Sequence, residues 1–207
     1  FYSKMWSFDT AVDMGSHVGD QYAYSIEQGT TKTGQGGSLV VTGLATGGPA
    51  GPMEKQDFSP VSVSWSMMGT DISAGQTGTL ELSHVYDRSS APDVLVKVGF
   101  DENAIKSSHA GAVSPCTALN AAQSNTWYDL EIKMDYLSET TSILVDDVVT
   151  CTYTWSAELV AGGLPAQTAK DVRLLSHGIV SKTYYDNVTI KCDPNQPASS
   201  CKDGAQN

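Results

Sequence analysis

Residues 61–67 are Val-Ser-Val-Ser-Trp-Ser-Met, and this short run decides the fold class. Apolar side chains occupy every odd position, and serine occupies every even one. Successive side chains of a β-strand point to opposite faces, so the run sets one face against a core and the other toward water. The same alternation recurs at residues 79–83, 94–100 and 128–135. Period-two patterning of this kind predicts antiparallel strands with one covered face.

Further strands are predicted around these runs. Residues 142–145 and 148–153 flank Asp146-Asp147, a connection of the length found in tight hairpins. Only residues 117–123 have helix-forming content. The other expected strands cover residues 22–27, 38–42, 172–176 and 184–191, with Gly- and Pro-rich segments between them. Roughly ten to twelve strands at this regular spacing predict an all-β fold, an antiparallel two-sheet jelly-roll β-sandwich.

The chain contains no internal repeat and no linker in its middle. Residues 1–192 are therefore expected to form one β-sandwich domain, and residues 193–207 a polar C-terminal tail tethered by a disulfide. The first six residues are rich in large apolar side chains, which must pack somewhere. They are expected to form either the first strand of the domain or a contact with a neighbouring copy of the chain.

Composition restricts the class of partner. The 207 residues include 12 Lys and Arg against 23 Asp and Glu, which gives a net charge of −11. This excess of acid excludes nucleic acid as the main partner, because such binding needs cations that neutralise phosphates. No apolar run approaches the roughly 18 residues needed for membrane insertion. With only 17% charged residues, the composition is typical of an extracellular β-protein, secreted or at the cell surface.

Cysteine usage agrees with an oxidising compartment. None of the four cysteines lies in a Cys-x-x-Cys pair or at zinc-finger spacing from a histidine, which disfavours zinc. An even number favours two disulfides, and four buried free thiols are the alternative. The short separation of Cys192 and Cys201 favours a bond between them, which leaves Cys116 to pair with Cys151.

Five segments, taken in order, resemble a known superfamily. They are Phe-Asp at 8–9, Gly-Gly-Ser-Leu-Val-Val at 36–41, Thr-Trp-Tyr-Asp-Leu-Glu-Ile-Lys-Met-Asp at 126–135, Ser-Ile-Leu-Val-Asp-Asp-Val at 142–148 and Tyr-Tyr-Asp-Asn-Val-Thr-Ile at 184–190. Their order resembles the concanavalin A-like lectin and glucanase superfamily, laminin-G-like modules included, and is similar in part to sandwich carbohydrate-binding modules. The resemblance implies a concanavalin A-like jelly roll but no single activity, because this fold hosts lectins, hydrolases, lyases and adhesive modules.

Catalytic signatures of these relatives are absent. The Glu-x-Asp-x-x-Glu motif of the glucanases is missing, and Glu131 and Asp135 are predicted on a solvated strand face. Residues 84–88 contain lyase-type side chains without the lyase motifs, and Gly15-Ser16-His17 lacks a nucleophile elbow. We therefore expect a non-catalytic carbohydrate-binding or adhesive module. A structural subunit of an extracellular filament, sheath or appendage is the alternative, and a divergent polysaccharide lyase is a third interpretation.

A metal site is suggested near the last strand. Asp186 shares parity with Val188 and Ile190 and is therefore predicted to point inward, where a carboxylate needs a partner. The resemblance to carbohydrate-binding modules implies a structural Ca²⁺ held by Asp9, carbonyls around residues 34–37, and Asp186. The alternative is that Asp186 caps backbone amides at the strand end.

Two further kinds of site involve surface side chains. Asn187-Val188-Thr189 is an N-glycosylation sequon, and Asn187 has outward parity. Trp127, Trp155 and Tyr185 are candidates for stacking on sugar rings, with packing at the rim of the sandwich as the alternative. The expected partners are accordingly carbohydrate or neighbouring copies of the chain.

Overall fold

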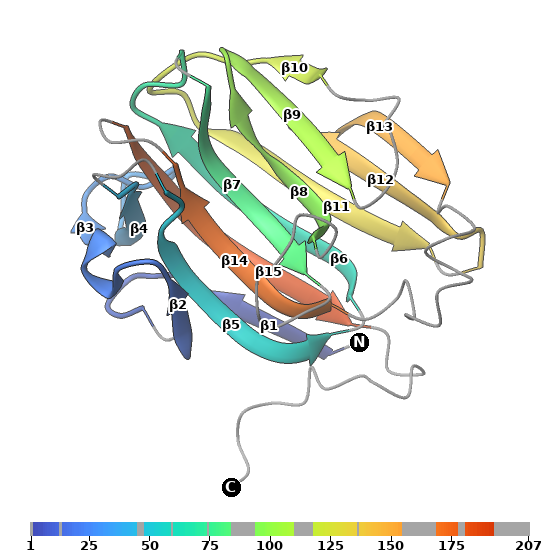
Figure 1. Ribbon diagram of the computed structural model, residues 1–207, viewed down its shortest axis with the longest axis horizontal. Coiled ribbons are helices and arrows are strands. Elements are labelled where there is room, and N and C mark those ends of the chain that lie inside the picture. Colours follow the sequence, from blue (N-terminus) through green and yellow to red (C-terminus); the bar gives the residue numbers. More distant parts are fainter. Residues whose placement is uncertain are drawn as a thin grey trace, which may run out of the picture.

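The structure, a computed structural model, describes residues 2–12, 14–44, 48–58, 60–73, 75–83, 94–109, 118–135, 137–154, 169–177 and 181–192. These residues form two antiparallel sheets that face each other in a β-sandwich (Figure 1). A single 3₁₀ turn, η1 (Gln21–Ala23), is the one helical element among them. None of the described residues forms a helix with the length and apolar character needed to cross a membrane.

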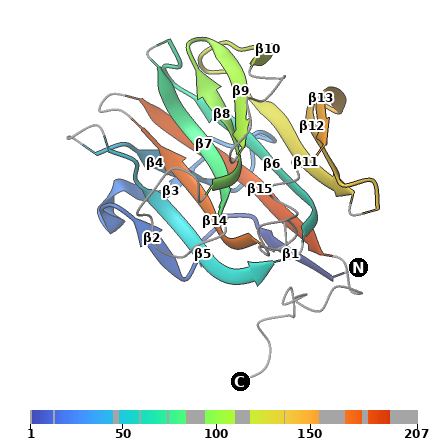
Figure 2. The ribbon, with the colours of Figure 1, turned by 45° about the vertical axis from the view of Figure 1, so that its right-hand side comes forward.

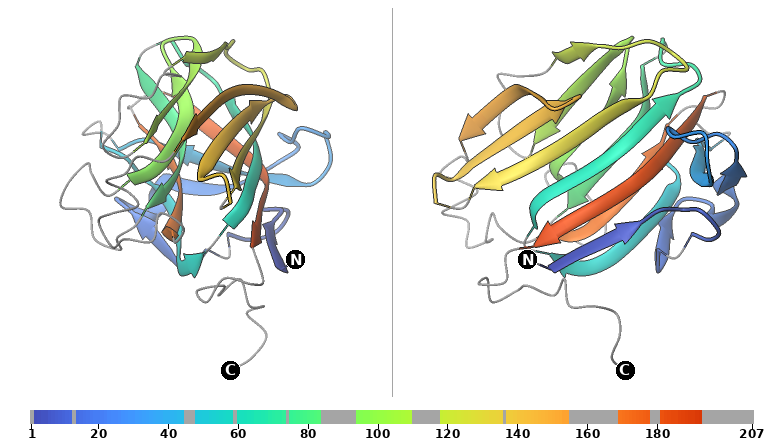
Figure 3. Two further views of the ribbon diagram at one scale, coloured as in Figure 1. Left: turned by 90° about the vertical axis from the view of Figure 1, so that its right-hand side faces the viewer. Right: turned by 180° about the vertical axis from the view of Figure 1, so that it is seen from behind.

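Sheet A, shown from its outer side in the right-hand view of Figure 3, contains the final strand of the fold at its centre. Its spatial order is β13 (Val148–Thr154), β12 (Thr140–Val145), β11 (Tyr128–Asp135), β6 (Pro60–Gly69), β15 (Lys182–Cys192), β4 (Gly37–Thr42) and β3 (Tyr24–Gln28), with β1 (Tyr2–Trp6) also paired to β15.

Sheet B forms the opposite layer of the sandwich. Its spatial order is β10 (Ala118–Ala121), β9 (Ala104–His109), β8 (Val94–Asp101), β7 (Gln76–Ser83), β14 (Ala169–Ser176), β5 (Gly51–Phe58) and β2 (Ser16–Val18). The two-sheet jelly-roll architecture predicted from the alternating runs is therefore confirmed.

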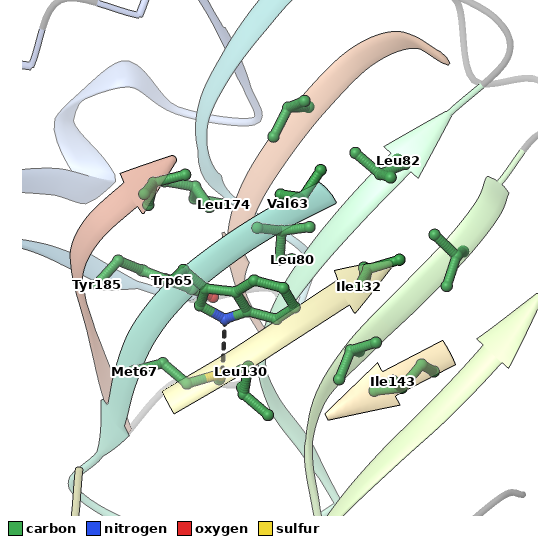
Figure 4. Close-up of a cluster of buried hydrophobic side chains, with 14 of the residues drawn as sticks. Val63, Trp65, Met67, Leu80, Leu82, Leu130, Ile132, Ile143, Leu174 and Tyr185 are labelled. Atoms are coloured by element: carbon green, nitrogen blue, oxygen red, sulfur yellow. Dashed lines mark hydrogen bonds between the residues drawn. The ribbon is translucent and has the colours of Figure 1, made fainter. Parts of the chain in front are cut away.

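The core consists of the apolar side chains that the period-two pattern pointed inward. Val63, Trp65 and Met67 of β6 are at most 2% exposed, and so are Leu130 and Ile132 of β11. They pack between the sheets (Figure 4), where the Trp65 indole N–H donates to the Met67 sulfur at 3.2 Å. Trp65 is thus a core residue, as predicted.

The β12–β13 hairpin closes with the predicted two-residue turn. Asp146 and Asp147 have φ angles of 50° and 65°, both in the left-handed region that a type I′ turn requires. The turn is attached to the start of β11, because the Asp129 amide donates to the Asp146 carboxylate at 2.9 Å. This contact positions the turn over the outer face of sheet A.

The stretch with helix-forming content, residues 117–123, is not helical where the structure describes it, from residue 118 onward. Residues 118–121 are instead strand β10, which pairs with β9 at the edge of sheet B. A segment of this length is too short to form a stable helix alone, because helix nucleation is costly. The hydrogen-bonding edge of β9 offers it partners immediately.

Residues 2–6 form a strand of the domain itself, which was one of the two arrangements expected for the N-terminal residues. β1 pairs with β15 from Tyr2 opposite Cys192 to Trp6 opposite Val188, so the two strands run side by side (Figure 2). Trp6 is 1% exposed, whereas Met5 is 63% exposed. The tail at residues 193–207 lies outside the described residues, and self-association stays a prediction.

Cys151 and Cys192 are both buried, and neither is a free thiol. They lie on β13 and β15, which are four strand spacings apart in sheet A, or about 19 Å. A disulfide needs Cα atoms within about 7 Å, so these two cysteines cannot be joined to each other. Cys116 and Cys201 lie outside the described residues, and the pairing therefore stays a prediction.

Peptide mapping without reduction tests the disulfides. We expect one peptide pair that joins Cys116 to Cys151 and a second that joins Cys192 to Cys201. Each bond should stabilise the fold by about 2–4 kcal/mol through its constraint on the unfolded chain. A peptide that joins Cys151 to Cys201 would contradict this pairing.

Candidate functional site on the outer face of sheet A

Strand β15 changes its partner halfway along its length. Its first part pairs with β4, its last part pairs with β1, and β6 accompanies it on the other side. At the change of partner, the register with β6 shifts between Asp186 and Thr189, and Asn187 has a φ angle of 52°. Two residues of β15 thus oppose one residue of β6, which is a β-bulge.

Two predictions fail at this bulge: the inward position of Asp186, which was inferred from strand alternation, and the choice of Tyr185 as a stacking candidate. Asp186 lies opposite Ser66 on the outer face of sheet A, and not on the inward face with Val188 and Ile190. Tyr185 points inward, is fully buried and donates its hydroxyl to the Thr79 carbonyl at 2.9 Å. Tyr185 therefore cannot stack on a sugar, because the extra residue reverses the parity of everything before it.

Asp9 and Asp186 lie near each other where β15 changes partner. Asp186 is only 3% exposed, and burial raises the pKa of its carboxyl, with a further upward contribution from the charge of Asp9. The backbone amides of Lys32 and Asn187 donate to this carboxylate, which is the predicted capping alternative. The Gly37 amide donates to Asp9 Oδ1 at 3.4 Å.

The structure thus brings together the two carboxylates of the expected calcium site. A side chain at position 36 would collide with the Asp9 carboxylate, so Gly36 leaves the room in which Asp9 sits. Across the described ranges, no group of three His, Cys, Asp or Glu side chains could hold a metal. An ion here would therefore need backbone carbonyls as its remaining ligands, a donor set that suits Ca²⁺.

A row of polar side chains continues from Asp186 across the sheet. Asp186 lies opposite Ser66 of β6, and Ser66 lies opposite Asp129 of β11. The Ser66 hydroxyl donates to Asp129 Oδ1 at 2.6 Å, and the Lys32 ammonium forms an ion pair with Asp129 Oδ2. Lys32 therefore contacts Asp186 through its backbone and Asp129 through its side chain, and we call the Lys32–Asp129 ion pair the ridge.

Beside this ridge lies a hollow of about 390 Å³ on the outer face of sheet A. Strands β6, β11, β12 and β15 and the β12–β13 turn contribute to its walls. Its polar lining includes Ser64, Asp129, Glu131, Asp147, Asn187 and Lys191. Hydroxyl, carboxylate, amide and ammonium groups therefore meet in one small surface depression.

Two departures from regular sheet geometry bring side chains to the hollow. The bulge in β15 presents Asn187 on one side, whereas Leu144 on the other side belongs to the regular alternation of β12, beside a register shift whose extra residue lies in β13. The left-handed turn presents Asp147 at the end. Bulges re-aim side chains and gather near functional sites, and left-handed residues other than glycine cost free energy. Their convergence marks the hollow as the candidate site.

Trp127 lies on the same outer face, on the far side of the ridge. It is half-buried against Val40, Met68 and Tyr184, which we call the aromatic patch. The Tyr184 hydroxyl donates to Glu27 at 3.1 Å, and burial followed by the Glu27 charge raises the pKa of Tyr184 to about 12. Trp155, the other tryptophan candidate, lies outside the described residues.

Sequence reasoning named four residues of this face, Asp9, Trp127, Asp186 and Asn187, and missed the groups between them. Glu131 was placed on a solvated face, and it does lie on the outer side of β11. Asp129 shares that parity and could have been found with it. No sequence pattern around Lys32 indicated its place in the site, because its partner Asp129 is 97 residues away in the chain.

The strand order and the two facing sheets define a concanavalin A-like β-sandwich, as the resemblance implied. No protein-family model matches the sequence, and no protein of curated function matches it. Solved structures with the same fold include a seed lectin of Lotus tetragonolobus, with a TM-score of 0.61, 11% identity, and coverage of 94% of this chain and 100% of the lectin.

The apo form of the Crh5 transglycosylase is also similar, with a TM-score of 0.55, 16% identity, and coverage of 93% of this chain and 85% of that one. A sialidase matches with a TM-score of 0.56 and 10% identity over 88% of this chain, which spans only 19% of the sialidase. At these identities the similarity shows the fold alone.

Proposed function

We propose that the chain is an extracellular, non-catalytic carbohydrate-binding module that holds a sugar in the hollow. The bulge at Asn187 and the left-handed turn at Asp147, which both bring polar side chains to this hollow, carry the proposal. Sugar hydroxyls both donate and accept hydrogen bonds, and they are matched by the carboxylate of Glu131, the amide of Asn187 and the ammonium of Lys191. The fold that the chain shares with a seed lectin supports the same class of ligand.

The contacts of the carboxylates support binding rather than catalysis. Glycoside hydrolysis needs one carboxyl group that donates a proton to the leaving oxygen. Asp129 is engaged by Lys32 and Ser66, and Glu131 Oε2 lies 3.2 Å from the Lys133 ammonium. Both acids are thus held as hydrogen-bond acceptors, which suits recognition of sugar hydroxyls.

Binding to a glycan array, followed by titration of the selected sugar, tests this function. Glu131→Gln should weaken binding about tenfold or more, since a hydrogen bond to a charged group contributes about 1.5–3 kcal/mol. Glu139→Gln is the matched control, because Glu139 is exposed and lies away from the hollow. An array without a selected sugar, or a Glu131→Gln variant that binds like the wild type, would refute the proposal.

A structural Ca²⁺ at Asp9 and Asp186 is part of the proposal. The pKa of Asp186 is higher in the folded protein than in the unfolded chain, so the folded state is favoured while this carboxyl is protonated. As the pH rises from the unfolded pKa through the folded pKa, this stability is lost. A cation between the two carboxylates would offset this cost at neutral pH.

Thermal unfolding of the wild type and Asp9→Asn, each with Ca²⁺ and with EDTA, tests the metal site. The wild type should melt at a higher temperature with Ca²⁺, since an ion that binds only the native state stabilises it. Asp9→Asn should lose this response, yet in EDTA it should be at least as stable as the wild type, because a negative charge beside Asp186 is gone. Equal melting temperatures of the wild type in both conditions would argue against the ion.

The extracellular setting rests on the predicted disulfides and on the sequon. Asn187 is exposed and lines the hollow, so a transferase could reach it. A glycan on Asn187 would stand on the wall of the hollow. Glycosylation at this residue and binding of a free sugar should therefore exclude each other.

One observation favours a second candidate function, a subunit of an extracellular filament. Among the strands that the structure describes, β13 forms an outer edge of sheet A, and its residues Val148 and Val149 are 63% and 57% exposed. An open strand edge with exposed apolar residues can accept a strand from a neighbouring copy. Sedimentation of the purified chain distinguishes polymers from monomers.

A further inference from the structure

The ridge separates two surfaces of different chemistry on the outer face of sheet A. On one side lies the aromatic patch with Trp127, and on the other lies the polar hollow with Glu131. Residues 127, 129 and 131 of the same chain segment follow one another on this face, about 7 Å apart, because residues two apart in a strand share a side. Asp129 therefore stands between the tryptophan and the hollow.

We propose that Lys32 is a specificity-determining residue, which limits the ligand to the hollow and keeps it from the aromatic patch. The proposal rests on the proposed function of the hollow. Ser66 and Asp186 are 5% and 3% exposed, so the floor between the two surfaces is covered. Lys32 and Asp129, whose side chains are 37% and 43% exposed, lie above that floor. The ion pair is thus a raised barrier across the face.

The barrier is held in place by the backbone of its own loop. The Lys32 amide donates to the Asp186 carboxylate, so the loop is fixed to the sheet independently of the lysine side chain. The Thr31 hydroxyl donates to the Gln35 carbonyl at 2.9 Å, and the Gly29 amide donates to the Gly36 carbonyl at 3.1 Å. Shortening the side chain of Lys32 should therefore remove the barrier and leave the loop in position.

A ligand that crosses the lowered barrier would reach the half-buried ring of Trp127. Stacking of a sugar ring on an indole adds to affinity beyond polar contacts. A hollow of about 390 Å³ accepts only a short segment of an oligosaccharide, whereas the joined surface would accept a longer one. Lys32 thus sets the oligosaccharide length beyond which additional sugar units no longer raise the affinity.

Titration of a length series of the sugar selected on the array tests this assignment. For the wild type, affinity should stop rising once the hollow is filled, and Trp127→Ala should leave it unchanged. Lys32→Ala should gain about three- to tenfold for the longer members only, and Trp127→Ala in that background should abolish the gain. Lys32→Arg keeps the charge and should preserve the wild-type length profile.

The outcomes separate this proposal from the function on which it rests. If the wild type binds a sugar and Lys32→Ala shows the same length profile, the barrier is refuted and the hollow stands. If Trp127→Ala weakens wild-type binding of the shortest sugar, the aromatic patch already belongs to the site and the barrier is refuted. If neither the wild type nor Lys32→Ala binds any sugar, both proposals fall.

Discussion

Replacement of Arg173 by methionine is expected to lower the free energy of unfolding by about 3–5 kcal/mol. Arg173 lies on β14 and is 1% exposed, and its Nη2 atom is 2.6 Å from Asp171 Oδ2. Glu81, also fully buried, lies opposite Arg173 on β7 and 3.5 Å from the Lys97 ammonium. Loss of the guanidinium would leave the buried carboxylates of Asp171 and Glu81 with the Lys97 ammonium as their nearby cation. An uncompensated charge is costly in a medium of low polarity.

Urea denaturation at neutral pH measures this effect. Lys106→Met is the matched control, because Lys106 pairs with Asp101 and Glu102 near the surface, where such pairs contribute at most about 1 kcal/mol. The double variant Arg173→Met with Asp171→Leu should recover part of the loss, since it removes one uncompensated charge. A loss below 1 kcal/mol for Arg173→Met would show that the buried cluster does not hold sheet B together.

Trp6→Ala should destabilise the fold by about 3–5 kcal/mol, the range found when a large core aromatic is truncated. Trp6 is 1% exposed and closes the sandwich beside β15, and the Lys4 ammonium lies 4.9 Å from the centre of its ring. Trp6→Phe should retain most of the stability, because the indole N–H is buried without a hydrogen-bond partner among the described residues.

Met5→Ala is the control for Trp6→Ala on the same strand. Its side chain is 63% exposed, so its loss should change the free energy of unfolding by no more than about 0.5 kcal/mol. A large difference between the two variants shows that β1 is part of this domain. Equal, small effects would show instead that the N-terminal segment does not pack on its own sandwich.

Much of the fold could be predicted because, in a strand without a bulge, the alternation of apolar and polar residues shows which side chains face the core. Leu80, Leu82, Val96, Val98 and Phe100 alternate along two strands, and all are fully buried as the pattern predicted. The pattern that marks the buried face lies within each strand, so this face can be predicted without knowledge of the neighbouring strands. The order of strands within each sheet depends on contacts between distant segments, so the alternating pattern does not predict it.

The site was harder to predict because it is built from irregularities. Parity assigns each residue to a face only while every residue has a partner, and the extra residue at Asn187 breaks this condition. The wrong assignment of Asp186 to the inward face has this cause. Asparagine tolerates positive φ better than most residues, so an Asn inside a strand could have warned of a bulge. Lys32 offered no comparable warning, since its role depends on a contact between distant segments.

The central place of β15 has a consequence for biosynthesis. Residues 188–192 pair with residues 2–6, so β1 cannot pair with β15 until nearly two hundred further residues have been synthesised. Contacts between such distant parts of a chain slow folding. Until β15 emerges, β1, β4 and β6 each lack a hydrogen-bonding neighbour, and bare strands of this kind recruit other chains. We therefore expect a chain that is cut short before β15 to aggregate rather than to fold.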